Sequence, residues 1–318
     1  QFCYTTSMSF RSRIYISLAI GLAILVIRLL PIARFGNDTA WPHCYAREVL
    51  AGRDPYGPAC QFFEPGTGRL YPANPLTTAV VLLPFAPLSQ AHAAALVSAM
   101  SGGLAAFALL RTGRAWRLLA LLSAPALHAL WFAQWGVLLL AVALLPALLP
   151  LTLVKPHIGL PIALTRLTWR RALACAVFGL ATFAIMPDWP LRWLRLVGGF
   201  NGYIPLLTLP GMLLLLALLR WRDLDARYLL LCAIIPQRAL YDAPILAAAL
   251  RTRTEMMVWV LVTWLYWPLV YIFGNSQEWV ARLVTATAYV PLLALLLWRG
   301  RATSPAADTV VREPISPA

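Results

Sequence analysis

The sequence predicts an all-α, polytopic membrane protein, and three observations support this fold class. Mean hydropathy is +0.73, and 61% of the residues are hydrophobic while only 12% are charged, whereas soluble domains carry about 25% charged residues. Apolar runs such as 14–30, 256–273 and 280–298 are long enough, or nearly so, to cross a bilayer. These runs lack the alternation of period two that a transmembrane barrel requires. We therefore expect a bundle of about ten transmembrane helices.

The net charge is +14, the positive charges are almost all arginines, and most of these arginines gather in short segments between the apolar runs. This spacing is typical of the positive-inside rule, so it indicates a lipid bilayer around the chain and argues against a nucleic-acid partner. It places the N- and C-termini in the cytoplasm of a multi-pass protein of the cell membrane. The clusters are Arg11/Arg13, Arg111/Arg114/Arg117, Arg166/Arg170/Arg171, Arg220/Arg222/Arg227, Arg251/Arg253 and Arg299/Arg301.

The first half of the predicted bundle follows from these clusters. A retained first helix over 14–34 leads outward to a long first external loop, residues 36–75. The run 76–88 is short for a span and contains two prolines, which favours an interfacial or re-entrant segment. The remaining helices of this half are expected at 91–110, 118–134 and 137–154, and the last of them brings Lys155 to the cytoplasmic side.

The second half alternates in the same way. A helix over 172–186 leads to a second external loop, 187–203, and a helix over 204–219 returns. Residues 228–250 contain the polar break PQRALYDAP, which predicts a broken hairpin with Asp242 at its tip. Helices over 256–273 and 280–298 complete a transmembrane domain of residues 1–298, and a disordered cytoplasmic tail is expected over 299–318.

The first external loop is the most polar part of the chain and holds four of its twelve carboxylates. Asp38 stands three residues after Phe35, where the first helix should leave the membrane. A carboxylate at such a boundary can have a raised pKa and act as a general base. The alternative is that Asp38 caps a short helix. Cys44 and Cys60 share the loop and could pair if it faces an oxidising compartment.

Other polar residues have both a functional and a structural interpretation. Asp54 in GRDPYG is typical of a turn, and His43 is expected at the surface, where it could bind phosphate. Lys155 among apolar residues either snorkels or has a partner. External Arg192 and Arg195 suit an anionic headgroup, or else belong to an interfacial helix anchored by tryptophans.

Two further residues interrupt apolar segments. Gln134, together with His128, could join helices or line a cavity. Asp242 is an intramembrane candidate for function, and an ion pair with Arg238 four residues earlier is its simplest structural account.

Motifs of other enzyme classes are absent from the sequence. It contains no GxGxxG, Walker, HExxH, GxSxG or CxxC pattern, so neither a nucleotide nor a zinc or haem site is predicted. We expect no cofactor, and the sequence leaves a divalent metal requirement open.

The first external loop resembles that of a known family. After the first helix come GNDxxxxxxYAREVLAGRDPYG and then RLYPANPLTTAVVLLPFAPL. This arrangement resembles the bacterial polyprenyl-phosphate-mannose-dependent mannosyltransferases of the GT-C superfamily. A glutamine near a helix end, a later Lys-Pro and a late Tyr-Asp extend the likeness. The matching residues are Asp38, Tyr45, Ala46, Leu50, Gly52, Pro55, Tyr56, Tyr71, Pro72, Pro75, Gln134, Lys155, Pro156, Tyr241 and Asp242.

The chain also departs from the family pattern. It is shorter than usual, the interval from Gln134 to Lys155 is about one helix short, and the usual Tyr-Pro-Pro is replaced by Tyr71-Pro72-Ala73-Asn74-Pro75. Lys155 would serve the family chemistry only at the external side, which conflicts with the predicted topology.

The resemblance implies a GT-C-like fold and an inverting glycosyltransferase with an external active site. It would transfer a sugar, mannose by the likeness, from a polyprenyl-phosphate-linked sugar donor to a glycan or glycolipid acceptor, with Asp38 as the base. Substrate-binding candidates are His43, Tyr45, Asp54, Tyr56, Tyr71, Gln134, Lys155, Arg192, Arg195 and Asp242. The rival hypothesis is a non-enzymatic transporter or flippase of lipid-linked sugars, and a structural membrane subunit is a third.

Overall fold

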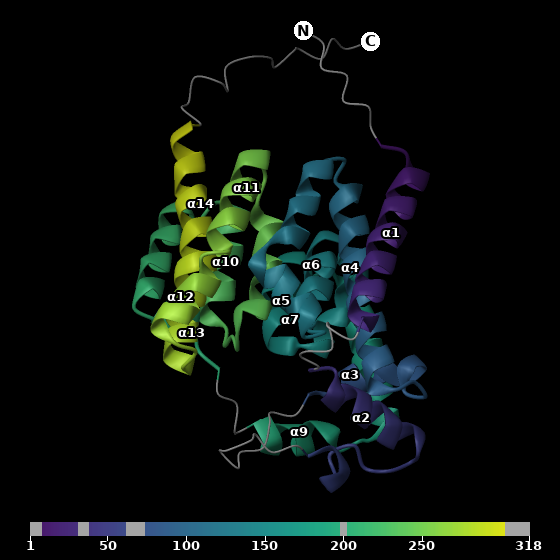
Figure 1. Ribbon diagram of the computed structural model, residues 1–318. Helices are drawn as coiled ribbons and strands as arrows, with labels where there is room; N and C mark the ends of the chain where they lie inside the picture. Colours follow the sequence, from purple (N-terminus) through teal and green to yellow (C-terminus); the bar gives the residue numbers. More distant parts are fainter. Residues whose placement is uncertain (1–7, 31–37, 62–73, 198–201, 303–318) are drawn as a thin grey trace, which may run out of the picture.

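The computed structural model describes residues 8–30, 38–61, 74–197 and 202–302. In this part of the chain the regular elements are helical, apart from one isolated bridge between Tyr203 and Gln237. The helices stand side by side in a bundle, and α2, α3 and α9 gather at one end of it (Figure 1). We call this the Asp38 end. The opposite end, where α1 begins and α14 finishes, is the arginine end.

In chain order, the α-helices are α1 (Phe10–Leu29), α2 (Ala40–Leu50), α3 (Leu76–Leu82), α4 (Gln90–Arg111), α5 (Ala124–Trp131), α6 (Gly136–Leu144), α7 (Pro156–Arg166), α8 (Trp169–Ile185), α9 (Trp189–Val197), α10 (Leu224–Ile234), α11 (Arg253–Thr263), α12 (Tyr266–Phe273), α13 (Gln277–Val284) and α14 (Val290–Ala302). Between them lie the 3₁₀ helices η2 (Pro58–Cys60), η3 (Leu83–Phe85), η4 (Ala115–Leu122), η5 (Pro146–Val154), η6 (Pro205–Leu207), η7 (Pro210–Arg220) and η8 (Leu240–Ala249), and the π-helical turn η9 (Thr285–Tyr289).

Four helices among the described residues are long and apolar enough to cross a membrane, and a fifth span results if the bent pair α8–α9 is counted as one. This confirms the predicted all-α class and agrees with a multi-pass membrane protein, while the count of about ten spans stays a prediction. Large apolar side chains such as Leu22, Leu180, Leu219 and Leu261 are exposed on the outside of the bundle. A soluble protein rarely exposes so much apolar surface, whereas lipid solvates it at no cost.

Local sequence signals start the helices where the structure has them. Ser9, Ser89, Ser123 and Ser276 each accept a hydrogen bond from a backbone N–H in the first turn of α1, α4, α5 and α13. Thr252 and Glu255 form a capping box at α11. These side chains satisfy N–H groups that the helix itself leaves without partners.

The predicted spans at 91–110, 172–186, 256–273 and 280–298 are present as α4, α8, α11–α12 and α13–α14. The first predicted span is present as α1, and its last four residues lie outside the described part. The short run 76–88 forms α3 and η3 beside α2, and its interfacial or re-entrant placement stays a prediction. The broken hairpin is confirmed, because α10 and η8 are separated by a break at 235–239. The segments 118–134 and 204–219 contain 3₁₀ helices, and 3₁₀ runs of this length are uncommon.

The prediction for Lys155 was wrong. Residues 137–154 do not carry the chain across the bundle: α6 ends at Leu144, η5 begins at Pro146, and the chain returns to its starting end. Lys155 therefore lies beside Gln134, with its Nζ 3.2 Å from the Gln134 Oε1. The helix α7, which the sequence analysis did not predict, then leads to Arg166 at the arginine end.

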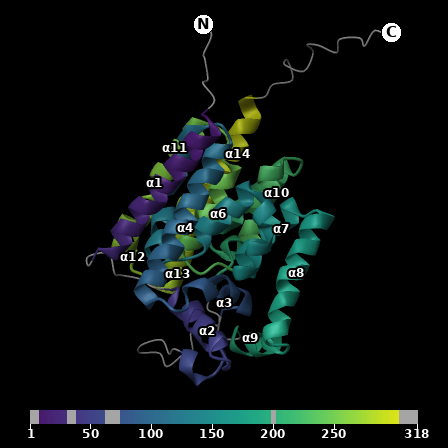
Figure 2. The same cartoon turned by 90° about the vertical axis from the view of Figure 1, so that its right-hand side faces the viewer.

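The C-terminal segment and the predicted second external loop also differ from expectation. The tail does not begin at 299, because α14 extends to Ala302; residues 303–318 lie outside the described part. The segment 187–203 contains α9, which bends by 95° from α8 and runs across the Asp38 end (Figure 2). Arg192 and Arg195 thus lie on a helix, as their structural alternative required, and its place at a membrane interface stays a prediction.

Candidate functional site

Asp38 is held against the turn that follows α5. Its backbone N–H donates to the Phe132 carbonyl at 3.0 Å, and the Thr39 hydroxyl donates to the Ala133 carbonyl at 2.9 Å. Ala133 has a φ of 52°, a left-handed conformation that residues other than glycine seldom adopt. Strained residues of this kind gather at functional sites. Here the turn presents Gln134 toward Asp38.

A chain of hydrogen bonds joins four side chains from four separate parts of the sequence. Gln134 Nε2 donates to Asp38 Oδ2 at 2.5 Å, and Lys155 Nζ donates to Gln134 Oε1 at 3.2 Å. Lys155 Nζ also forms an ion pair with Asp242 Oδ1 at 2.5 Å. The Lys155 side chain is 11% exposed and that of Asp242 is fully buried. The carboxylate at Asp38 is thereby coupled to a buried cation.

Backbone breaks bring these residues together. Gln134 precedes α6, Lys155 follows η5, and Asp242 stands in the first turn of η8. The Asp242 Oδ2 accepts the backbone N–H of Arg238 at 2.9 Å, so the break before η8 fixes its carboxylate. The predicted ion pair between Arg238 and Asp242 was therefore wrong, since the ionic partner of Asp242 is Lys155 from another element.

A glycine allows α6 and η8 to approach each other at this point. A Cβ on Gly136 would stand 2.0 Å from the carbonyl oxygen of Tyr241 and 3.2 Å from the ring of Pro244. No side chain fits there. The absence of a Cβ thus sets the distance between the helix that follows Gln134 and the 3₁₀ helix that carries Asp242.

These residues open into a pocket of about 230 Å³ at the Asp38 end. Among the described residues, the pocket combines one carboxylate with cationic side chains and aromatic rings, and Lys155 Nζ lies 4.8 Å from the centre of the Tyr241 ring. Its lining residues are Asp38, Trp41, Asn74, Pro75, Gln134, Trp135, Val154, Lys155, Pro156, His157, Trp193, Val197, Pro236, Arg238 and Tyr241.

Burial changes the acidity of Asp38. Removal from water raises the pKa of its carboxyl group; the Gln134 hydrogen bond and the positive charges of Arg238 and Lys155 act in the opposite direction, and the net direction is upward. A raised pKa makes a carboxylate a stronger base near neutral pH. The alternative role as a helix cap was wrong, because the side chain bonds to Gln134 and Thr39 occupies the cap position of α2 without a side-chain bond.

An apolar groove of about 720 Å³ lies next to the pocket. It runs between α1 and α4, which are in contact along their length, and it is lined almost wholly by aliphatic and aromatic side chains, including Leu18, Leu22 and Phe107. Trp135 lines both the groove and the pocket of Asp38. An amphiphile could therefore place its apolar chain in one and its polar head in the other.

Three candidates from the predicted first external loop, residues 36–75, form the scaffold of that loop and do not line the pocket. His43 is 3% exposed, its Nε2 lies 3.2 Å from the Phe85 carbonyl oxygen, and burial lowers the pKa of its ring. The prediction of a surface histidine was wrong. Tyr45 and Tyr56 are buried with ring centres 5.4 Å apart, and burial raises the pKa of Tyr45 to about 12. A disulfide bond between Cys44 and Cys60 closes the same loop, so the possible pairing is confirmed.

Asp54 and Arg192 also bind each other and not the pocket. Asp54 Oδ1 accepts the Tyr56 backbone N–H at 2.9 Å, which confirms the turn interpretation. Its Oδ2 pairs with Arg192 at 2.6 Å, and Asp188 pairs with the same guanidinium at 2.7 Å. Arg195 is exposed and does not line the pocket. Tyr71 lies outside the described residues.

Several lining residues were not predicted to belong to the site. Arg238 was assigned only as a structural partner of Asp242, and Trp41, Asn74, Trp135 and His157 were not singled out as ligands. Their only sequence signal was proximity, because each stands within four residues of a candidate or in the polar loop 36–75. The sequence does not show which of them face the pocket, because that depends on where η5 and η8 interrupt the α-helices.

In the described residues, no three His, Cys, Asp or Glu side chains lie close enough together to hold a metal ion.

No protein-family model matches the chain, and neither a curated protein nor a solved structure matches it.

Proposed function

We propose that this protein is an integral-membrane glycosyltransferase that uses a polyprenyl-phosphate-linked sugar. The sugar is mannose by the sequence resemblance, and the acceptor is a hydroxyl of a glycan or glycolipid. The observation that carries the proposal is the chain from Asp38 through Gln134 to Lys155 in a single pocket. It supplies a base and a cation together, which transfer from a lipid phosphate requires.

Asp38 would take the acceptor proton. Gln134 occupies its Oδ2, and among the described residues no side chain donates to its Oδ1. That oxygen can accept the acceptor O–H. As the proton moves to Asp38, the acceptor oxygen bonds to the anomeric carbon from the face opposite the phosphate, and the configuration inverts. The bond between the anomeric carbon and the phosphate oxygen breaks, and its electron pair stays on the lipid phosphate.

Lys155 would stabilise the departing phosphate. An ammonium group has three N–H donors; here one points to Asp242 and one to Gln134, which leaves the third for a phosphate oxygen. Arg238 lines the same pocket and adds a second positive charge. Because the site is partly desolvated, such charges stabilise the developing anion more than they would in water.

The adjoining apolar groove suits the polyprenyl chain. Its walls on α1 and α4 are apolar, and Trp135 connects it to the pocket. In this arrangement the tail stays in an apolar environment while the phosphate reaches Lys155. We place the pocket on the external side, because the arginines gather at the other end of the bundle.

The test is transfer of radiolabel from polyprenyl-phospho-mannose to an acceptor glycan by the purified chain in detergent. Asp38→Asn should lower the turnover number by about 10²- to 10⁴-fold. Asp54→Asn is the matched control at the same end, outside the pocket, and should change turnover by less than about threefold. Full turnover in Asp38→Asn would exclude this base. Translocation of the lipid-linked sugar across reconstituted vesicles, without glycosidic transfer, would favour the transporter hypothesis.

A further inference from the structure

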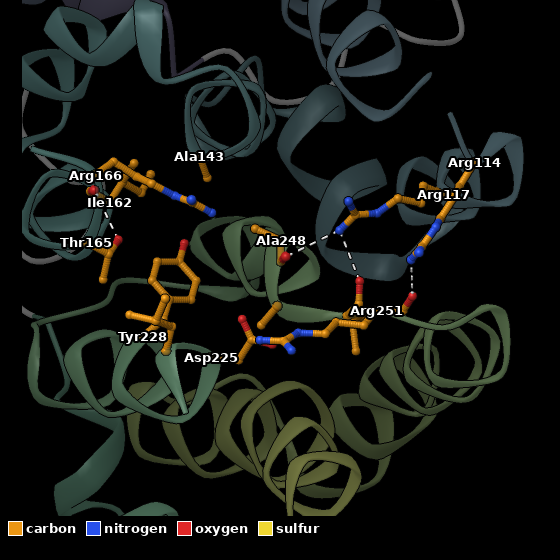
Figure 3. Close-up of a pocket in the computed structure, with 13 residues that line it drawn as sticks. Arg114, Arg117, Ala143, Ile162, Thr165, Arg166, Asp225, Tyr228, Ala248 and Arg251 are labelled. Atoms are coloured by element: carbon orange, nitrogen blue, oxygen red, sulfur yellow. Dashed lines mark hydrogen bonds and ion pairs between the residues drawn. The ribbon is translucent and has the colours of Figure 1, made fainter. Parts of the chain in front are cut away.

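A second polar pocket, of about 320 Å³, lies at the arginine end (Figure 3). Four arginines from three parts of the chain line it. Arg114 and Arg117 stand at the start of η4, Arg166 ends α7, and Arg251 follows η8. Arg166 and Arg117 approach the hollow from opposite sides (Figure 3). The function proposed above does not use this pocket.

The positive charge of this pocket exceeds its negative charge. Asp225 is the only carboxylate among the described lining residues. It pairs with Arg251 at 2.6 Å and with Arg299, which does not line the pocket, at 2.7 Å. Asp223 also pairs with Arg251, at 3.3 Å. The carboxylates therefore compensate Arg251, and the charges of Arg114, Arg117 and Arg166 remain.

The three remaining arginines have spare donors. Arg117 Nη2 donates to the carbonyl oxygens of Ala248 and Leu250, at 3.3 and 3.0 Å, while its Nε is buried without an acceptor. Arg114 Nη1 donates to the Arg251 carbonyl at 2.7 Å. The guanidinium of Arg166 has no hydrogen-bond acceptor among the described residues. A guanidinium has five N–H donors, so most of them remain available in this pocket.

The positive-inside rule accounts for arginines on this face, but not for their convergence on a hollow, where their charges repel. We propose that the pocket binds a phosphate group, either as free phosphate or as the headgroup of an anionic phospholipid. Guanidinium groups bind phosphate oxygens in bidentate fashion. The apolar walls at Ile162 and Leu224 are compatible with the glycerol part of a lipid.

The experiment measures binding to the purified full chain in neutral detergent by calorimetry. Two probes separate the two sources: inorganic phosphate alone, and short-chain phosphatidylglycerol. Phosphate binding would support recognition of the free group, and binding of the lipid alone would support a headgroup site. A short-chain diacylglycerol without phosphate should not bind. If neither phosphate-bearing probe binds, the proposal is overturned.

Arg166→Gln is the informative variant, because the exposed Arg166 guanidinium has no hydrogen-bond acceptor or ion-pair partner among the described residues, so its loss should leave the fold intact. We expect it to weaken binding of the active probe by about tenfold to a hundredfold. Arg111→Gln is the matched control, since Arg111 is an exposed arginine at the same end, outside the pocket; it should bind as the wild type does. Unchanged binding in Arg166→Gln, or equal weakening in Arg111→Gln, would exclude the pocket as the site.

Discussion

The ion pair between Lys155 and Asp242 gives the most direct test of the site. Asp242 is fully buried and Lys155 nearly so, and their charged atoms are 2.5 Å apart. Removing one partner of such a pair leaves a buried charge without compensation and costs about 3–5 kcal/mol. Lys155→Met and Asp242→Asn should therefore each lower the free energy of unfolding by about that amount.

The double variant, Lys155→Met with Asp242→Asn, measures the interaction between the two charges apart from the contacts that each makes with its surroundings. When both charges are removed, neither is left uncompensated, so the loss should be well below the sum of the single losses. We expect a coupling energy of about 3 kcal/mol, near the upper end for residues in contact. The measurement is unfolding in mixed micelles with increasing dodecyl sulfate, followed by tryptophan fluorescence.

The ion pair between Glu278 and Arg282 is the control. Its side chains are 71% and 37% exposed, and such pairs contribute at most about 1 kcal/mol. A coupling below about 0.5 kcal/mol for Lys155 and Asp242, equal to that of the control, would refute the buried pair. Transfer activity should stay lost in the folded double variant, because the cation proposed to bind the phosphate is missing.

Three further predictions concern the loop, the base and the helix contact. Reduction of the bond between Cys44 and Cys60, 16 residues apart, should destabilise the loop by about 3 kcal/mol, measured as faster proteolysis; unchanged proteolysis would contradict this. Because the pKa of Asp38 is raised and the base must be deprotonated, activity should fall as pH drops through that pKa, above the range of an exposed carboxylate near 4. An acidic limb of kcat/KM at or below about pH 4 would be the contrary result. Gly136→Ala should destabilise the chain by at least about 1–3 kcal/mol, since its Cβ would overlap the Tyr241 carbonyl, and an unchanged Tm would disprove that contact.

The sequence was sufficient for the features that depend on local composition. The helical class, α4, the hairpin around Asp242 and the turn at Asp54 follow from hydropathy, from the break PQRALYDAP and from Asp-Pro chemistry. Asp38 was found in the same way, because a carboxylate just past an apolar run is visible in one dimension. Each of these patterns extends over neighbouring residues in the sequence, so the structure it predicts does not depend on knowing the tertiary contacts.

The position of Lys155 could not be found in this way. Residues 137–154 are apolar over a length that can span a bilayer, and a hydropathy pattern does not distinguish one crossing from a hairpin that turns at Pro146. The helix α7 was missed because Gly159 and Pro161 lower its helix propensity, while its burial against η5 and α10 stabilises it. The turn at Pro146 reverses the side on which Lys155 falls, and α7 then returns the chain to the arginine end.

The buried pair of Lys155 and Asp242 also indicates what the site binds. In the low-dielectric interior, a lysine and an aspartate cost several kcal/mol each to desolvate, and two apolar side chains of similar volume are often as stable or more so. Stability alone therefore gives no reason for Lys155 and Asp242. The pair instead holds a cation at a fixed position, with one N–H still available, two hydrogen bonds from the Asp38 carboxylate through Gln134. A charge kept at this cost beside a pocket and an apolar groove is most simply explained by a ligand that is itself anionic at one end and apolar at the other.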